Sequence, residues 1–138
     1  YKEVLARLTR KWEDSADAVP GPVIIEAAQP ASRAIISVGG CDGAVREALD
    51  RLAERGIHLN YLRVRGFPFS AEVDAFMDSH DEIYVVDQNR DAQLRGLFIN
   101  DTSVPKTKLV SVLDFSGMAA NPAFISEGVT AHLALEEA

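Results

Sequence analysis

VVDQNRDAQL, residues 85–94, joins a buried strand to a helix and decides the fold. The strand side begins at residues 82–84 (EIY) and is rich in β-formers. After the polar residues, Leu94, Leu97 and Phe98 recur at helical spacing. In an open α/β sheet, ligands and partners meet the carboxyl ends of the parallel strands. The dense polar set that follows this strand is therefore the first candidate for a contact surface.

The same alternation extends outward in both directions. Strand patterns occur at residues 34–38, 57–64 and 109–113, and helical apolar faces occur at residues 45–53, 73–77 and 124–133. Strands that alternate with helices predict right-handed parallel crossovers, with helices on both faces of the sheet. Three prolines in residues 19–30 make that stretch a connector, in which Val23–Ile25 fits an edge strand.

The sequence contains residues that are typical of helix starts and helix ends. Asp42 and Ser70 are predicted to cap the helices that follow them, and Gly56 is predicted to end a helix in the left-handed conformation. Asn121 followed by Pro122 predicts the start of the last helix.

Composition limits the classes of function. The 138 residues suit one compact core, and a net charge of −7 disfavours broad attraction to nucleic acid or anionic lipid. The single cysteine excludes an internal disulfide and an all-cysteine iron–sulfur or zinc site within this chain. This cysteine usage favours a cytoplasmic setting. No apolar run approaches the length of about 18 residues that a membrane helix needs.

The first 18 residues differ from the rest. Val4, Leu5, Leu8 and Trp12 give an amphipathic helical pattern, and the first residue is Tyr1 rather than Met. We expect residues 1–18 to be the end of a linker from an upstream domain and residues 19–138 to form the α/β domain. A processed or tagged small protein is the alternative.

Three features of the sequence could carry chemistry: a glycine-rich turn, a single cysteine and three histidines. In GGCDG, residues 39–43, Val38 stands where a dinucleotide-binding G-x-G-x-x-G pattern would need glycine, so the glycines favour a tight turn. Cys41 near a helix start could be a reactive thiolate, but with no second cysteine a packing role is favoured. The histidines share no ligand spacing, so no metal site is expected; they are His58, His80 and His132.

The polar residues after the strand exceed what a helix cap needs. Asn89 or Asp91 can cap the next helix, and Arg90 can pair with Asp87 or Asp91. A cap accounts for one of these five polar side chains, so we expect the segment also to contact a ligand or partner. We expect no catalytic residue in it. The contact residues predicted in this way are Asn89, Arg90 and Gln93.

This stretch, together with GAVREA (43–48) and GFPF (66–69), resembles the carboxy-terminal domain of the alpha subunit of 2-oxoacid:ferredoxin oxidoreductases, the 2-oxoglutarate type most of all. TKLV (107–110) and FSGM (115–118) resemble the end of that subunit. The resemblance implies a three-layer α/β/α, transketolase C-terminal-like domain. It also implies a mostly parallel five-stranded sheet whose one antiparallel edge strand is Val23–Ile25.

The resemblance further implies a complex that decarboxylates a 2-oxoacid with thiamine diphosphate, passes electrons through an iron–sulfur cluster to ferredoxin and forms an acyl-coenzyme A. Those groups would belong to the upstream thiamine-enzyme domain and the beta subunit. This chain would be a non-catalytic domain that supports assembly and shapes the active site.

Its implied ligand or interdomain contacts are Asp87, Asn89, Arg90, Gln93, Gly39, Gly40, Asp42, Phe67 and Phe69. Phe67 and Phe69 would present apolar surface to the upstream domain. The chain departs from the family pattern at Asp87, where glutamate is common, and at Gly40-Cys41-Asp42, where a Ser or Thr pair is common.

Two other functions remain open from the sequence. A free-standing module for small anions or regulation could use Arg65, Arg90 and Lys106 as its cations. A thiol enzyme centred on Cys41 is the weaker possibility.

Overall fold

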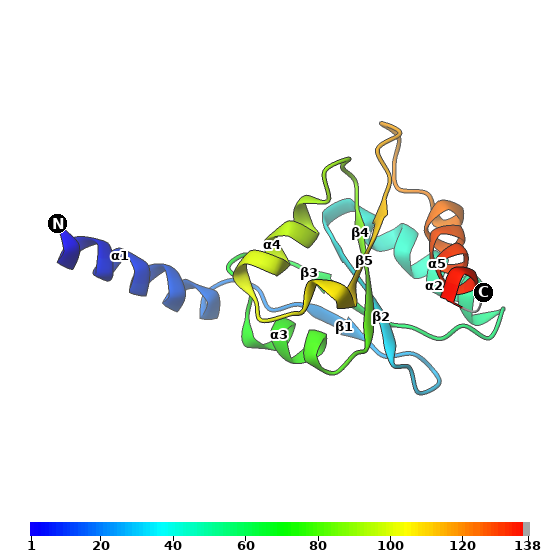
Figure 1. The fold of residues 1–138 in the computed structure, drawn as a ribbon, viewed down its shortest axis with the longest axis horizontal. Helices are drawn as coiled ribbons and strands as arrows, with labels where there is room; N and C mark the ends of the chain where they lie inside the picture. Colours follow the sequence, from blue (N-terminus) through cyan, green and yellow to red (C-terminus); the bar gives the residue numbers. More distant parts are fainter. Residues whose placement is uncertain (137–138) are drawn as a thin grey trace.

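The computed structural model describes residues 1–136, which form one sheet between two layers of helices, with one helix standing apart (Figure 1). The strands are β1 (Val23–Ile25), β2 (Arg33–Val38), β3 (Asn60–Val64), β4 (Glu82–Asp87) and β5 (Leu109–Leu113). The helices are α1 (Lys2–Asp14), α2 (Asp42–Ala53), α3 (Ala71–Asp78), α4 (Gln93–Asp101) and α5 (Pro122–Glu136). Short 3-10 turns are η1 (Ser15–Asp17), η2 (Gly39–Cys41) and η3 (Lys106–Lys108).

The sheet has the order β1-β3-β2-β4-β5. β2 pairs in parallel with β3 and β4, and β4 pairs in parallel with β5. β1 runs antiparallel to β3, with Val23 opposite Arg63. The predicted mostly parallel sheet with Val23–Ile25 as its antiparallel edge is confirmed.

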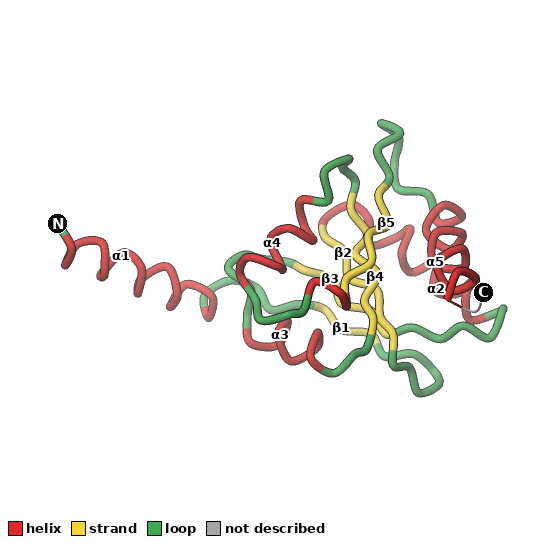
Figure 2. Tube along the Cα trace, viewed as in Figure 1, coloured by secondary structure: helices red, strands yellow, loops and turns green. Residues whose placement is uncertain are grey.

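Helices α2 and α5 cover one face of the sheet, and α3 and α4 cover the other (Figures 1 and 2). Successive side chains of a strand point to opposite faces. In β2, Ile36 therefore packs in the core under α3 and α4, whereas Ile35 packs in the core under α2 and α5. Burial on both faces explains why β2 and β4 are nearly continuous apolar runs rather than alternating ones.

The predicted helix ends are confirmed in part. Gly56 has φ +78°, and Ile57 donates its amide to the Leu52 carbonyl at 3.0 Å, which closes α2 with a Schellman turn. Asn121 Oδ1 accepts the Ala123 amide at 2.9 Å at the start of α5.

Two predicted caps are wrong. Asp42 is the first residue of α2, but its carboxylate binds other side chains and makes no capping bond. Ser70 occupies the N-cap position of α3, yet its hydroxyl makes no capping bond and is buried without a hydrogen-bond partner.

Helix α1 projects away from the sheet and buries none of its residues (Figure 1). Its apolar stripe is about half-exposed at Val4, Leu5, Leu8 and Trp12. Within the described chain, no helix combines the length and the apolar character needed to cross a membrane.

Candidate functional site at the carboxyl edge of the sheet

The helices that follow the neighbouring strands β2 and β4 pack on opposite faces of the sheet. After β2 the chain enters α2 on one face, and after β4 it enters α4 on the other. This is a topological switch point, where open α/β folds form their binding crevices. The loops that follow β4 and β5 rise beside each other at the top of Figure 2, and the Asp114 amide donates to the Asp87 carbonyl at 3.1 Å.

The loop after β4 is held by side-chain oxygens. Asp87, only 7% exposed, accepts the Leu94 amide on Oδ2 at 2.9 Å. Asn89 Oδ1 accepts the amides of Asp91 at 3.0 Å and Gln93 at 3.2 Å. Both residues therefore satisfy free amides at the start of α4, whose N-cap residue, Ala92, has no side chain able to do so. The predicted capping role of Asn89 is confirmed, and Asp87 shares it.

Beside this loop lies a hollow of about 370 Å³, which we call the strand-end hollow. It is lined by Val38, Val64, Arg65, Gly66, Phe67, Phe69, Asp87, Asn89, Gln93, Leu94 and Leu97. Five of the nine predicted contact residues thus meet in one place, two from the loop after β3 and three from the end of β4 and the segment that leads into α4. Gln93 and Leu97 are exposed at its rim.

Aromatic rings build one wall of the strand-end hollow. Phe67 and Phe69 meet edge to face with ring centroids 5.1 Å apart, and Phe69 packs on Phe98 of the core at 4.8 Å. Phe67 is 38% exposed and meets Trp12 of α1 at 5.6 Å. The hollow therefore combines a rigid apolar wall with amide and guanidinium groups, a mixture typical of ligand and partner sites.

Arg90 lies outside this hollow. Its guanidinium pairs with Asp91 at 2.8 Å, and its side chain is 76% exposed. An exposed pair of this kind contributes little to stability, so Arg90 can turn toward a partner at small cost.

The turn after β2 contains Gly39 and Gly40, both exposed. Gly39 has φ +64°, which favours glycine, and a Cβ on Gly40 would lie 3.8 Å from Gln88 Oε1. The turn after β2 therefore lies close to the Gln88 side chain in the loop after β4.

Asp42 belongs to a polar network on the α2 side of this edge. Its carboxylate accepts bonds from Arg46 at 3.1 Å and from the Tyr61 hydroxyl at 3.0 Å, and Arg63 lies 3.7 Å away. Burial opposes ionisation, but these donors and charges outweigh it and lower the pKa of Asp42. The Tyr61 hydroxyl also bonds Ser37 at 2.7 Å, and burial raises the pKa of Tyr61. Asp42 thus ties α2 to β3 and does not face the strand-end hollow.

Cys41 is 2% exposed. Burial raises the pKa of its thiol, and the negative charges of Asp87 and Asp114 raise it further. A thiolate is therefore disfavoured, and the packing role of Cys41 is supported over the thiol-enzyme reading.

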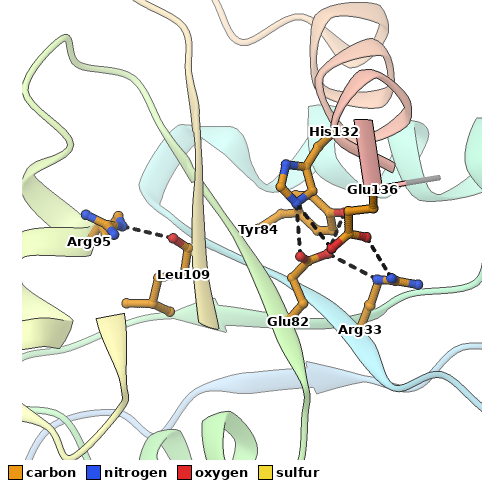
Figure 3. Close-up of polar contacts among 7 residues, drawn as sticks. All are labelled: Arg33, Glu82, Tyr84, Arg95, Leu109, His132 and Glu136. Carbon is orange, nitrogen blue, oxygen red and sulfur yellow. Dashed lines mark hydrogen bonds and ion pairs between the residues drawn. The ribbon is translucent and has the colours of Figure 1, made fainter. Parts of the chain in front are cut away.

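The three cations of the anion-binding alternative do not converge. Arg65 and Arg90 follow strands at the carboxyl edge, whereas Lys106 precedes β5 at the opposite edge. There the Lys106 carbonyl accepts a bond from Arg95 at 3.1 Å. Arg95 also donates to the Leu109 carbonyl at 3.0 Å, and Figure 3 shows this second bond. Arg65 itself donates to the Gly21 carbonyl at 2.7 Å.

An apolar patch after β5 was not among the predicted contacts. It surrounds a second hollow of about 590 Å³, lined by Leu113, Asp114, Phe115, Ser116, Met118, Ala119, Asn121 and Phe124. Phe115 is 64% and Met118 76% exposed. Gln88 Nε2 donates to the Met118 carbonyl at 3.2 Å, which joins this patch to the loop after β4. Two large apolar residues in a glycine-containing turn after a strand were the signal available in the sequence.

No family model and no curated protein matches this chain. Among solved structures, it is similar to a 2-oxoglutarate:ferredoxin oxidoreductase from Magnetococcus marinus with 2-oxoglutarate, coenzyme A and succinyl-CoA bound. That similarity has a TM-score of 0.79 at 24% identity and covers 94% of this chain and 23% of the other. This chain therefore spans about a quarter of the length of that neighbour.

A second neighbour is the alpha chain of a probable 2-oxoacid ferredoxin oxidoreductase from Thermoplasma acidophilum, with a TM-score of 0.54 at 23% identity. That match covers 82% of this chain and 97% of the other. At such identities the likeness establishes the fold. Both neighbours carry the family name that the sequence resembles, so the resemblance is confirmed at the level of the fold.

Proposed function

We propose that this chain is the carboxy-terminal domain of the alpha subunit of a 2-oxoacid:ferredoxin oxidoreductase, and that it shapes the active site without performing the chemistry. The observation that carries the proposal is the fold shared with two such enzymes, combined with a strand-end hollow at the switch point. The whole complex would convert a 2-oxoacid, 2-oxoglutarate being the nearest case, to an acyl-coenzyme A in the cytoplasm.

The residues present do not fit the redox groups of such a complex. An iron–sulfur cluster needs several thiolates, and this chain has one cysteine, which is buried. At the carboxyl edge, Asp87 Oδ2 accepts the Leu94 amide and Asn89 Oδ1 accepts the Gln93 amide, so these two oxygens serve the start of α4. These groups would therefore be held by the upstream domain and by the beta subunit, which would pass electrons to ferredoxin.

The strand-end hollow is the proposed contact with the substrate or coenzyme A entrance. Its aromatic wall is fixed by the core through Phe69 and Phe98, so it offers a preformed surface. Gln93 supplies an exposed carboxamide beside it, and Arg90 supplies an exposed guanidinium nearby. Helix α1 would continue the linker from the upstream domain, and its half-exposed apolar stripe would pack against that domain.

Two variants of the intact complex test this role. Gln93→Ala combined with Leu97→Ala removes rim side chains and leaves the capping bonds of Asp87 and Asn89 in place. Lys106→Ala at the opposite edge is the matched control. We expect the double variant to weaken subunit association or raise KM for the 2-oxoacid or coenzyme A, while the control does neither.

Normal assembly and unchanged KM values in the double variant would show that the hollow is only surface. The purified 138-residue chain alone is expected not to turn over 2-oxoacids. Turnover by the chain alone would contradict the proposal directly.

A further inference from the structure

A histidine and two carboxylates converge at the amino-terminal edge of the sheet, opposite the strand-end hollow. Glu82 begins β4, and His132 and Glu136 lie one turn apart in α5. One ligand atom from each residue lies within 4.8 Å of the other two, and Figure 3 shows the three side chains turned toward one another.

Arg33 and Tyr84 orient the two carboxylates. Glu82 Oε1 accepts the Tyr84 hydroxyl at 2.7 Å and Arg33 Nε at 3.1 Å, while Glu82 Oε2 is hydrogen-bonded to His132 Nε2 at 3.0 Å, the bond that a metal ion would replace. In the same way Glu136 Oε2 binds Arg33 at 2.9 Å, and Glu136 Oε1 lies 3.9 Å from His132 Nε2. Each carboxylate thus gives one oxygen to supporting groups and turns the other toward the imidazole.

We propose that Glu82, His132 and Glu136 bind a divalent transition-metal ion, with Zn²⁺ as the reference case. This inference goes beyond the proposed function and does not depend on it. Bonds of about 2.1 Å in a tetrahedral zinc site place ligand atoms about 3.4 Å apart. The two separations from His132 Nε2, 3.0 and 3.9 Å, lie on either side of that value.

Charge and accessibility suit a cation. Two carboxylates face one guanidinium, so a negative charge remains when His132 is neutral. Glu82 is mostly buried, whereas Glu136 is 41% exposed at the side-chain level, which leaves an approach from solvent. One imidazole with two carboxylates favours Zn²⁺ and its neighbours in the transition series over Mg²⁺, which prefers six oxygen ligands.

Supporting groups of this kind are a feature of built metal sites. Partners that hydrogen-bond the ligands fix their orientation, and their loss typically weakens metal affinity about 10- to 100-fold. The bound ion would tie the last turn of α5 to the first residue of β4, two segments 50 residues apart along the chain. Metal binding would therefore stabilise the folded domain by mass action.

The test is a calorimetric titration of the chelator-treated chain with Zn²⁺, with Mg²⁺ as the comparison ion. We expect one Zn²⁺ per chain, no comparable Mg²⁺ binding, and a Zn²⁺-dependent rise in melting temperature. His132→Ala should weaken Zn²⁺ binding at least tenfold and abolish that rise. His58→Ala, the same substitution at a partly buried histidine outside the cluster, should change neither.

A second variant keeps the test decisive if His132→Ala folds poorly. Glu136→Gln changes a partly exposed side chain and should also weaken Zn²⁺ binding at least tenfold. Tetrahedral Co²⁺ absorption in the wild type, lost in Glu136→Gln, gives a spectroscopic check of coordination. Absence of Zn²⁺ binding, or equal affinity in wild type and both variants, would mean that the cluster is only an ion-pair network.

Discussion

Asp87→Ala should destabilise the domain by removing a buried capping bond. In the folded chain, Asp87 Oδ2 accepts the Leu94 amide at 2.9 Å, and Leu94 is itself only 6% exposed. In the Asp87→Ala variant the Leu94 amide has no side-chain acceptor, and water cannot easily replace it because Leu94 is buried. The loss occurs at the junction of β4 and α4, where helix amides have no intrahelical acceptor.

The magnitude follows from the bond that is lost. Loss of a helix-capping side chain costs about 0.5–2 kcal/mol, and a hydrogen bond to a charged group contributes about 1.5–3 kcal/mol. We therefore expect Asp87→Ala to lower the free energy of unfolding by about 2 kcal/mol. With an unfolding entropy of about 2.1 cal/mol/K per residue, this corresponds to a melting temperature about 7 °C lower for a chain of 138 residues.

Urea unfolding at neutral pH, with a thermal melt, measures the change. Asp87→Asn keeps an oxygen acceptor of the same shape and should cost less than about 1 kcal/mol. Asp91→Ala removes an exposed carboxylate paired only with Arg90 and should change stability by less than about 0.5 kcal/mol. Equal losses in Asp87→Ala and Asp87→Asn would refute the capping argument, as would an unchanged midpoint in Asp87→Ala.

Three further predictions use the same urea or labelling measurements. Gly39→Ala should destabilise the domain by about 1 kcal/mol, because Gly39 has φ +64°. Gly43→Ala should be neutral or stabilising, because an added Cβ in the first turn of α2 meets no atom within 4 Å. Equal effects of the two variants would contradict the turn geometry. Because folding lowers the pKa of Asp42, this carboxylate adds to the free energy of unfolding above about pH 3.9, and its contribution is lost as the pH falls through the pKa of the folded state. Asp42→Asn should therefore reduce the dependence of unfolding free energy on pH in that range. An unchanged pH dependence would contradict the role of Asp42. Cys41, buried and with a raised thiol pKa, should react with a thiol reagent far more slowly in the folded chain than in urea, and equal rates would contradict its burial.

The fold was predictable because its signals are local and repeated. The apolar runs of β2 and β4 and the helical spacing of the segments between strands identify the layers, and the prolines around Val23–Ile25 identify the edge. The bounds of one strand differ from the prediction. β3 begins at Asn60 rather than at Ile57, because Asn60 is the first residue that pairs with β2.

The candidate site was predictable only in part. Residues at strand ends were identified because parallel strands bring their carboxyl ends together, and Phe67, Asn89 and Gln93 do meet there. Lys106 lies at the other edge of the sheet, as its position before a strand already indicates, whereas Arg65 and Arg90 follow strands. The bond from Asp42 to Tyr61 could not be predicted, since it depends on how α2 packs across β3.

The cluster of Glu82 with His132 was missed for a different reason. The four-residue spacing of His132 and Glu136 on one helix is visible in the sequence, but the spacing of the histidines alone does not indicate it. Its third member comes from a strand 50 residues earlier, and only the packing of α5 over β4 brings it close.

Trp12 is the only tryptophan of the chain, and it stands on the projecting helix α1 with half of its surface in solvent. Intrinsic fluorescence excited at the indole therefore monitors that helix and its contact with Phe67, whose ring lies 5.6 Å away. Binding of a polypeptide over the apolar stripe would shift the emission to shorter wavelength, so an unlabelled sample can report whether a polypeptide covers α1.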